Sequence, residues 1–344
     1  MRAAMYYSNS DVRVEKVRTP KIGAGELLLR VEASGICGSD VMEWYRAHKV
    51  PLVLGHEVAG VVAEVGEGVS RYRIGDRVTA AHHVPCNTCH YCLSGNHTIC
   101  DTLRKTNFDP GGFAEYVRLP DINVDRGVFL LPDQVSFEEA TFVEPVACVL
   151  RGQRRAGMRP GCAVLVIGAG IAGLLHVHLA RALGAGRVLA TDIIQHRLDA
   201  AKRFGADAAL HAEEDISAYL RKVNDGRLAD LVVLCTGAEP AIAKALKSVE
   251  RGGTVLFFAP TAPGITFPIS MNDLFWRNDI TLTTSYAGSP ADYAVALELI
   301  RAGILRVKDM ITHRLSLADT GLGFRMVTRP QEYNSIKVIV EPRG

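Results

Sequence analysis

The feature that most restricts the fold of this chain is a glycine pattern placed between an apolar run and a helical one. Residues 162–182 read CAVLVIGAGIAGLLHVHLARA, in which Gly168-x-Gly170-x-x-Gly173 follows the apolar run directly. Gly168 permits a tight turn, Gly170 lets the backbone approach a pyrophosphate, and Gly173 lets helix and strand pack closely. The N-terminus of the helix then offers free N–H groups to phosphates. The segment therefore predicts the strand, turn and helix of a dinucleotide site.

A carboxylate at the end of the next apolar run supports this interpretation. Asp192 closes RVLATD (187–192), about 20 residues after the glycines, where it can accept hydrogen bonds from the ribose of a dinucleotide. It would repel a 2′-phosphate, which favours NAD over NADP, while Arg197 keeps NADP open. The alternative is an ordinary glycine turn, with Asp192 capping a helix. The residues predicted to bind the cofactor are Gly168, Gly170, Ile171, Ala172, Gly173, Asp192 and Arg197.

The rest of the chain divides into two segments that differ in their pattern of apolar runs. Strand-like and helix-like runs alternate from about residue 160 onward, which predicts an α/β domain with a doubly wound parallel sheet. The first ~145 residues instead hold short β-branched runs punctuated by glycine, such as ELLLRVEASGI and EVAGVVAEVG, which predict a barrel or sandwich. The chain has 344 residues, and a single core rarely exceeds roughly 250–300 residues. We therefore expect two domains.

Charge and hydropathy exclude several classes of protein. The net charge of +2 gives no footprint for nucleic acid or an anionic membrane, and no apolar run reaches the length of about 20 residues that spans a bilayer. The N-terminal segment MRAAMYYSNSDVRVEKV lacks the apolar centre of a signal peptide. We therefore expect a cytoplasmic protein without nucleic-acid or membrane partners. In that reducing compartment, closely spaced cysteines indicate a metal more often than disulfides.

Four cysteines follow one another as Cys86-x₂-Cys89-x₂-Cys92-x₇-Cys100. Four thiolates in one loop can surround Zn²⁺ tetrahedrally, and such a shell leaves no position for a substrate. The spacing predicts a structural zinc site that braces the fold. A disulfide pair, idle thiols and a zinc module for nucleic acid are the alternatives, the last disfavoured by the neutral charge.

An open metal site must then lie elsewhere if the chain does metal chemistry. Catalytic zinc is usually held by three protein ligands from Cys, His and carboxylate, with one position left open. Upstream of the four cysteines, GICGSD supplies Cys37, and LGHEVAG supplies His56 and Glu57. No local spacing rule joins these residues, and GHE alone is also compatible with an ordinary polar turn.

Taken together, these motifs resemble the zinc-dependent medium-chain dehydrogenase/reductase superfamily, which contains the alcohol dehydrogenase family. CGSD (37–40), GHE (55–57), the four-cysteine loop and the glycine turn occur in the order and approximate spacing of that family. Glu144-Pro145 in FVEPVACVLRG is similar to an element of the branch that contains sorbitol (L-iditol) and threonine dehydrogenases. The resemblance covers essentially the whole chain.

The resemblance implies a domain plan and an activity. A GroES-like catalytic domain with both zinc sites is expected over residues 1–147 and 288–344, and a Rossmann NAD-binding domain over 148–287. The implied reaction is the reversible oxidation of a secondary alcohol or polyol to a ketone, with hydride transfer to NAD. Two zinc ions per chain and a homodimer or homotetramer are the expected cofactors and assembly.

The resemblance also implies roles for single residues. Cys37 and His56 would bind the catalytic zinc, and Ser39 would start removal of the proton from the alcohol. Of Glu57 and Glu144, one would ligate zinc and the other would hold or exchange with its water, an assignment that stays open. Asp40 is expected only to support the loop that carries Cys37.

Three positions depart from relatives. Met42 stands where many alcohol dehydrogenases have a relay histidine, so His48, Glu43 or water would replace it. Glu43 stands where polyol dehydrogenases often have tyrosine, and Ser285-Tyr286 where they have an arginine–tyrosine pair, which weakens the case for sorbitol itself. The alternatives are an NAD-binding redox sensor or crystallin-like protein without turnover, and a reductase of activated alkenes or carbonyls.

Overall fold

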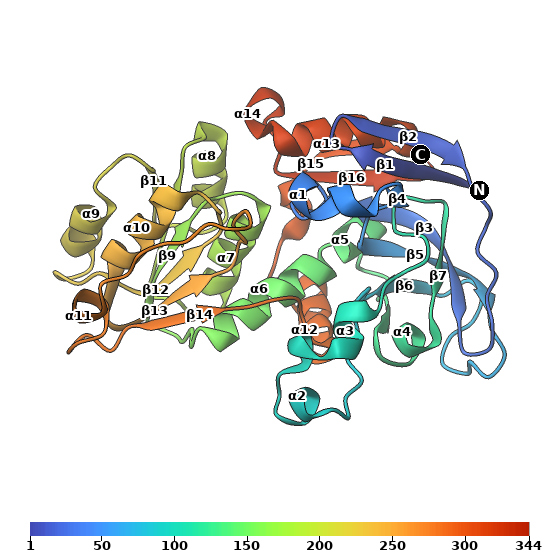
Figure 1. Ribbon diagram of the computed structural model, residues 1–344, viewed down its shortest axis with the longest axis horizontal. Helices are drawn as coiled ribbons and strands as arrows, with labels where there is room; N and C mark the ends of the chain where they lie inside the picture. The colour runs from blue at the N-terminus through green and yellow to red at the C-terminus, as the bar shows by residue number, and fades with distance from the viewer. Residues whose placement is uncertain (344) are drawn as a thin grey trace. The chain divides into compact units, whose positions relative to one another are not determined.

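The computed structural model describes residues 1–343 and divides into two compact units (Figure 1). The first unit is Met1–Ala147 with Ala287–Gly344, and the second is Cys148–Tyr286. Helix α6 (Val143–Arg155) contains the first boundary between them.

The second unit is built on a parallel sheet of six strands in the order β11-β10-β9-β12-β13-β14. Every residue of β9 is buried, as expected for a central strand that helices cover on both faces. Numbered within the unit, the order is 3-2-1-4-5-6, and ligands of such sheets bind where the order reverses, here between β9 and β12. The predicted doubly wound α/β fold is confirmed. Its strands are β9 (Ala163–Ile167), β10 (Arg187–Asp192), β11 (Ala208–His211), β12 (Ala229–Leu234), β13 (Val249–Phe257) and β14 (Thr281–Thr284).

Helices alternate with these strands along the chain. Apolar side chains of the strands form one core with buried residues of α9 and α10, among them Leu220, Ile242 and Ala245. The helices are α7 (Ile171–Ala182), α8 (Gln195–Arg203), α9 (Ile216–Val223), α10 (Glu239–Ser248) and the single turn α11 (Met271–Leu274).

The first unit is β-rich, as predicted. Its larger sheet has the order β15-β16-β3-β5-β6-β8, with β7 also paired to β3, and a smaller sheet has the order β2-β1-β4. The strands are β1 (Arg2–Ser8), β2 (Asp11–Lys16), β3 (Leu27–Gly35), β4 (Leu52–Val53), β5 (Glu57–Val65), β6 (Arg77–Ala80), β7 (Tyr116–Leu119), β8 (Val128–Leu130), β15 (Ile311–Ser316) and β16 (Lys337–Glu341). Short helices connect them: α1 (Glu43–Arg46), α2 (His90–Leu93), α3 (Asp101–Lys105), α4 (Asp121–Arg126), α5 (Phe137–Ala140), α12 (Pro290–Arg301), α13 (Thr320–Thr328) and α14 (Pro330–Tyr333).

The pairing of β3 with β5 positions the residues of the candidate functional site. The two strands run antiparallel from Leu27 opposite Val65 to Gly35 opposite Glu57. The end of β3 and the start of β5 therefore lie at the same edge, and β16 pairs with β3 at that end. Within residues 1–343, none of the helices has the length and apolar content needed to cross a bilayer.

Candidate functional site

The strand register brings three predicted ligands together. Cys37 follows the end of β3 and His56 precedes the start of β5, while Glu57 is the first residue of β5. One ligand atom from each residue lies within 4.8 Å of those of the other two. A thiolate, an imidazole and a carboxylate are the donor types that catalytic zinc uses, so this group can hold a metal.

Asp40 does more than the sequence predicted. It is wholly buried, and its Oδ2 accepts a hydrogen bond from the Cys37 N–H at 3.0 Å, which supports the loop as expected. Its Oδ1 also lies 3.4 Å from His56 Nδ1. A carboxylate behind a ligand histidine fixes the ring and leaves the other nitrogen for the metal. Asp40 therefore orients His56 as well as the Cys37 loop.

Glu57 has a partner that the sequence analysis missed. The Lys337 ammonium, at the start of β16, forms a buried ion pair with Glu57 Oε2 and also donates to the Ile36 carbonyl at 3.3 Å. Lys337 and Glu57 are both about 1% exposed. Gly35, which lies opposite Glu57, leaves space for this ion pair, because a Cβ at position 35 would collide with the side chains of Glu57 and Lys337. A lysine inside the apolar strand SIKVIVEP was the available sequence signal.

Ser39 and Glu144 complete the predicted catalytic residues. The Ser39 hydroxyl donates to Cys37 Sγ at 3.4 Å, so it lies beside the metal-ligand group. Arg46 Nε donates to the Ser39 carbonyl at 3.2 Å and fixes that loop. Glu144 is largely buried in the first turn of α6, and its carboxylate is not part of the group of ligand atoms around Cys37. Its role in the site stays a prediction.

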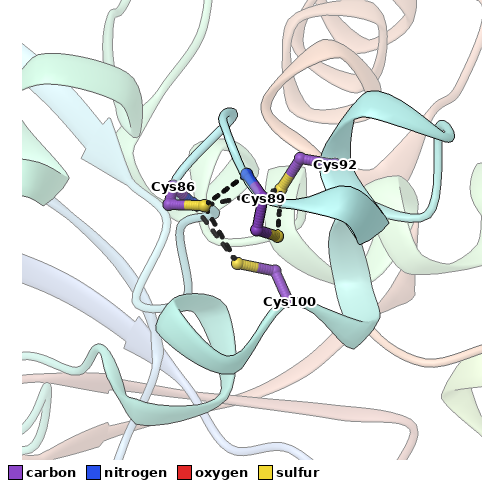
Figure 2. A group of neighbouring side chains, drawn as sticks. All are labelled: Cys86, Cys89, Cys92 and Cys100. Atoms are coloured by element: carbon purple, nitrogen blue, oxygen red, sulfur yellow. Dashed lines mark hydrogen bonds between the residues drawn. The ribbon is translucent and has the colours of Figure 1, made fainter.

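The four cysteines converge on one point, as Figure 2 shows. The Sγ atoms of Cys86 and Cys100 and of Cys89 and Cys92 are 3.6 Å apart, and those of Cys86 and Cys92 are 3.9 Å apart. Thiolates bound at about 2.3 Å to a tetrahedral zinc are about 3.8 Å apart. These separations fit a shared zinc ion and are far longer than the ~2.05 Å of a disulfide.

Backbone N–H groups of the loop around these cysteines can stabilise a negative charge on sulfur. The backbone N–H groups of Thr88 and Cys89 point at Cys86 Sγ from 3.4 and 3.2 Å, and Asn87, which follows Cys86, adopts a positive φ of 63°. Arg126 Nη1 donates to the carbonyls of Pro85 and Cys86 at 3.0 and 2.8 Å, which fastens the loop to α4. All four sulfur atoms belong to the cluster, so a tetrahedral ion that they held would have no open position for substrate.

The glycine turn has the local geometry that each of its glycines was predicted to supply. Gly168 has a φ of +92°, and a Cβ at Gly173 would clash with the Gly168 carbonyl, because strand and helix pack closely there. At Gly170, the N-cap of α7, the atoms nearest to a built Cβ belong to Arg197 at 3.8 Å. The backbone at Gly170 is therefore open to a phosphate group at the start of a 12-residue helix.

Asp192 ties the end of β10 to this turn. Its Oδ2 accepts from the Ala169 N–H at 2.7 Å, and its Oδ1 accepts from the N–H groups of Ile193 and Ile194 at 2.8 and 3.0 Å. Arg197 Nη1 lies 3.7 Å from the same carboxylate. The carboxylate is thus held in place beside the glycine turn at the carboxyl end of β10, the position where the sequence predicts a ribose-binding acid.

Two family models match this chain, one in each half. The family model "Alcohol dehydrogenase GroES-like domain" matches residues 23–133, and "Zinc-binding dehydrogenase" matches residues 172–302. A probable D-xylulose reductase A of Aspergillus clavatus is 34% identical over 92% of this chain and 89% of its own length. The chain belongs to the zinc-binding alcohol dehydrogenase family. The predicted family is confirmed, and so is the predicted GroES-like domain beside a Rossmann domain.

Two further relatives of this dehydrogenase cover nearly its whole length. Sorbitol dehydrogenase of Bacillus subtilis is 31% identical over 93% of the chain and 91% of its own length. The structure of alcohol dehydrogenase from Thermus sp. ATN1 superposes with a TM-score of 0.86 at 30% identity, covering 99% of each chain.

The structure of this dehydrogenase shows the contacts of the residues that were predicted to replace the relay histidine. Glu43, offered as a relay group, opens α1 and accepts from the Asn9 N–H at 3.2 Å, and His48 is exposed. The hydrogen bond of the Ser39 hydroxyl runs to Cys37 and to neither of them. Ser39 is partly exposed, and which group takes its proton stays a prediction.

A histidine pair adjoins the metal-ligand group of this dehydrogenase. The ring centroid of His82 lies 4.7 Å from that of His56 and 3.9 Å from that of His83. His83 Nδ1 hydrogen-bonds the Thr106 carbonyl at 2.6 Å. Burial, together with the nearby cations, lowers the pKa of His83 to about 4, and the pKa of His82 also falls well below its ordinary value. The pair is therefore uncharged near neutral pH.

Proposed function

We propose that this chain oxidises one secondary carbinol of a polyol to a ketone, reversibly, with NAD as hydride acceptor and zinc as Lewis acid. The observation that carries the proposal is the group of Cys37, His56 and Glu57, backed by Asp40 and adjoining Ser39. Relatives named D-xylulose reductase and sorbitol dehydrogenase support the choice of a polyol.

Cys37, His56 and Glu57 would hold the catalytic zinc. Glu57 has two carboxylate oxygens, and Oε2 is paired with Lys337, which leaves the other for the metal. We assign Glu144 to the water or substrate beside the metal, because its carboxylate lies outside the ligand group. Zinc bound here supplies the Lewis acidity that makes an alcohol ionise near neutral pH.

The residues of the chain then handle the proton and place the cofactor. The Ser39 hydroxyl receives the proton of the substrate alcohol and passes its own to water, since Met42 carries no titratable group. NAD bound here would supply the hydride acceptor, so that a secondary alcohol and NAD⁺ would become a ketone, NADH and a released proton. The glycine turn and α7 would hold the pyrophosphate, and Asp192 would accept hydrogen bonds from the ribose.

NAD is the proposed cofactor in preference to NADP. Asp192 is fixed and negative where a 2′-phosphate would lie, and Arg197, the cation that could attract such a phosphate, is already paired with it. Comparable kcat/KM values with NAD and NADP would overturn this preference.

The domain roles, the assembly and the compartment belong to the same proposal. Residues 1–147 with 288–344 would form the catalytic domain, and 148–287 the cofactor domain. Strand β14 lies at the edge of the parallel sheet, and Ile269, Met271 and Trp276 just before it are exposed apolar residues. Both features favour pairing of two copies along this edge, as a homodimer or within a homotetramer. A cluster of reduced thiols favours the cytoplasm.

The first test is NADH formation by the zinc-loaded protein with sec-butanol, glycerol, xylitol, sorbitol, inositol and threonine. Turnover of at least one secondary alcohol is expected, and Cys37→Ser and His56→Ala should abolish it while the circular dichroism spectrum is kept. Full activity of either variant would overturn the assignment. Tight NAD binding without turnover of any substrate would instead favour the redox-sensor interpretation.

A further inference from the structure

His82 has hydrogen-bonding capacity that the protein does not use. Its Nδ1 is buried and has no hydrogen-bond partner among residues 1–343. The adjacent His83 is a contrast, because its Nδ1 is bound to the Thr106 carbonyl. An unpaired buried polar group is destabilising, so a purely structural ring at this position would be better served by an apolar side chain.

The ring of His82, with its unused hydrogen-bonding capacity, lies next to the proposed metal site. Its ring packs against His56, one of the proposed zinc ligands, and Phe108 lies on another side with its centroid 6.1 Å away. Asn123 Nδ2 donates to the backbone carbonyls of Ala81 and His82 at 2.8 and 3.0 Å and so fixes the backbone that carries the ring. Nδ1 itself is buried, but the residue is partly exposed at its other atoms, so a small molecule can reach the open edge of the ring.

The chemistry of the ring selects the kind of partner. An imidazole that carries one proton has one N–H donor and one acceptor nitrogen, which complements a hydroxyl, itself both donor and acceptor. With the reacting carbinol at the metal, a hydroxyl on the neighbouring carbon would be within reach of a ring that packs on a metal ligand. An alcohol with a single hydroxyl has no such group to offer.

We propose that His82 is a specificity-determining residue that hydrogen-bonds the hydroxyl adjacent to the oxidised carbinol, so that the enzyme selects vicinal diols and polyols over simple secondary alcohols. The proposal rests on the proposed function, because it names the substrate class of that same site. It concerns substrate binding and gives His82 no part in proton removal.

The test compares two substrates that share a carbon skeleton: sec-butanol and the vicinal butanediol that carries a second hydroxyl on the neighbouring carbon. In zinc-loaded His82→Phe an aromatic ring still packs on His56, but the hydrogen-bonding nitrogens are gone. The ratio of kcat/KM for the diol to that for sec-butanol should fall roughly 10-fold, mostly through KM, as expected for one lost hydrogen bond. His82→Gln should recover part of the ratio. Zinc content should be retained, and kcat/KM for sec-butanol should change much less than kcat/KM for the diol.

Each other outcome is decisive. An unchanged ratio in His82→Phe, or equal losses for both substrates, would overturn the proposal, since a residue that only packs against His56 would affect both alike. Preference of the unmodified enzyme for sec-butanol would also overturn it. If the unmodified enzyme oxidises neither these alcohols nor any polyol, the proposed function itself fails, and His82 loses the role with it.

Discussion

The buried ion pair between Lys337 and Glu57 makes a strong prediction about stability. Replacing Lys337 by methionine keeps the length of the side chain but removes the ammonium, which leaves the Glu57 carboxylate buried without its partner. Breaking such a pair on one side costs about 3–5 kcal/mol. For domains of roughly 150–250 residues each kcal/mol lowers Tm by about 2–4 °C, so Tm should fall by roughly 6–20 °C.

The assay is thermal unfolding of chelator-treated protein followed by circular dichroism, with three companion variants, because zinc on Glu57 would itself act as a charge partner. Lys337→Arg keeps the charge and should recover part of the loss. Glu57→Gln alone should be destabilised as well, because it isolates Lys337. The double variant Lys337→Met, Glu57→Gln should be more stable than the sum of the two single losses predicts, since neither charge is left unpaired. A Lys337→Met protein that melts within about 2 °C of the unmodified chain would refute the reasoning.

Three further predictions follow from the metal and cofactor sites. Asp40→Asn should weaken zinc binding at the Cys37 site by roughly 10–100-fold, measured by competition with a chelator, and an unchanged affinity would mean that Asp40 does not orient His56. Cys86→Ser should lower bound zinc from two equivalents per chain to one by elemental analysis and lower Tm, whereas retention of both equivalents would contradict the four-thiolate site. Asp192→Ala should lower the ratio of kcat/KM for NAD to that for NADP by at least about 10-fold, and a constant ratio would show that the carboxylate does not select the cofactor.

Local patterns in the sequence predicted the parts of the molecule whose geometry is also local. The glycine turn needs only its own strand and helix, and the four cysteines of residues 86–100 come together within one loop, so spacing was enough for both. The doubly wound sheet followed from the alternation of strands and helices. In the glycine turn and the cysteine loop, neighbours along the chain are also neighbours in space, whereas the sheet also pairs β9 with β12, which are not consecutive.

The open metal group could not be predicted from spacing because it depends on strand register. Cys37 and His56 meet only because β3 and β5 pair so that Gly35 faces Glu57, and the resemblance to a family, rather than a local rule, pointed to them. Asp40 was underestimated because its contact with His56 crosses the same register. Lys337 was missed altogether, since its partner is 280 residues away along the chain.

That separation has a consequence for how the protein is made. A ribosome adding about 5–20 residues per second needs roughly 15–55 s to travel the 280 residues from Glu57 to Lys337. Throughout this interval β3 lacks its neighbour β16, and Glu57 has no ammonium beside it. The contiguous unit Cys148–Tyr286 emerges whole within the same period and can fold before the first unit is finished. The ion pair behind the metal-ligand group around Cys37 is consequently completed late in biosynthesis, although Cys37, His56 and Glu57 are translated early.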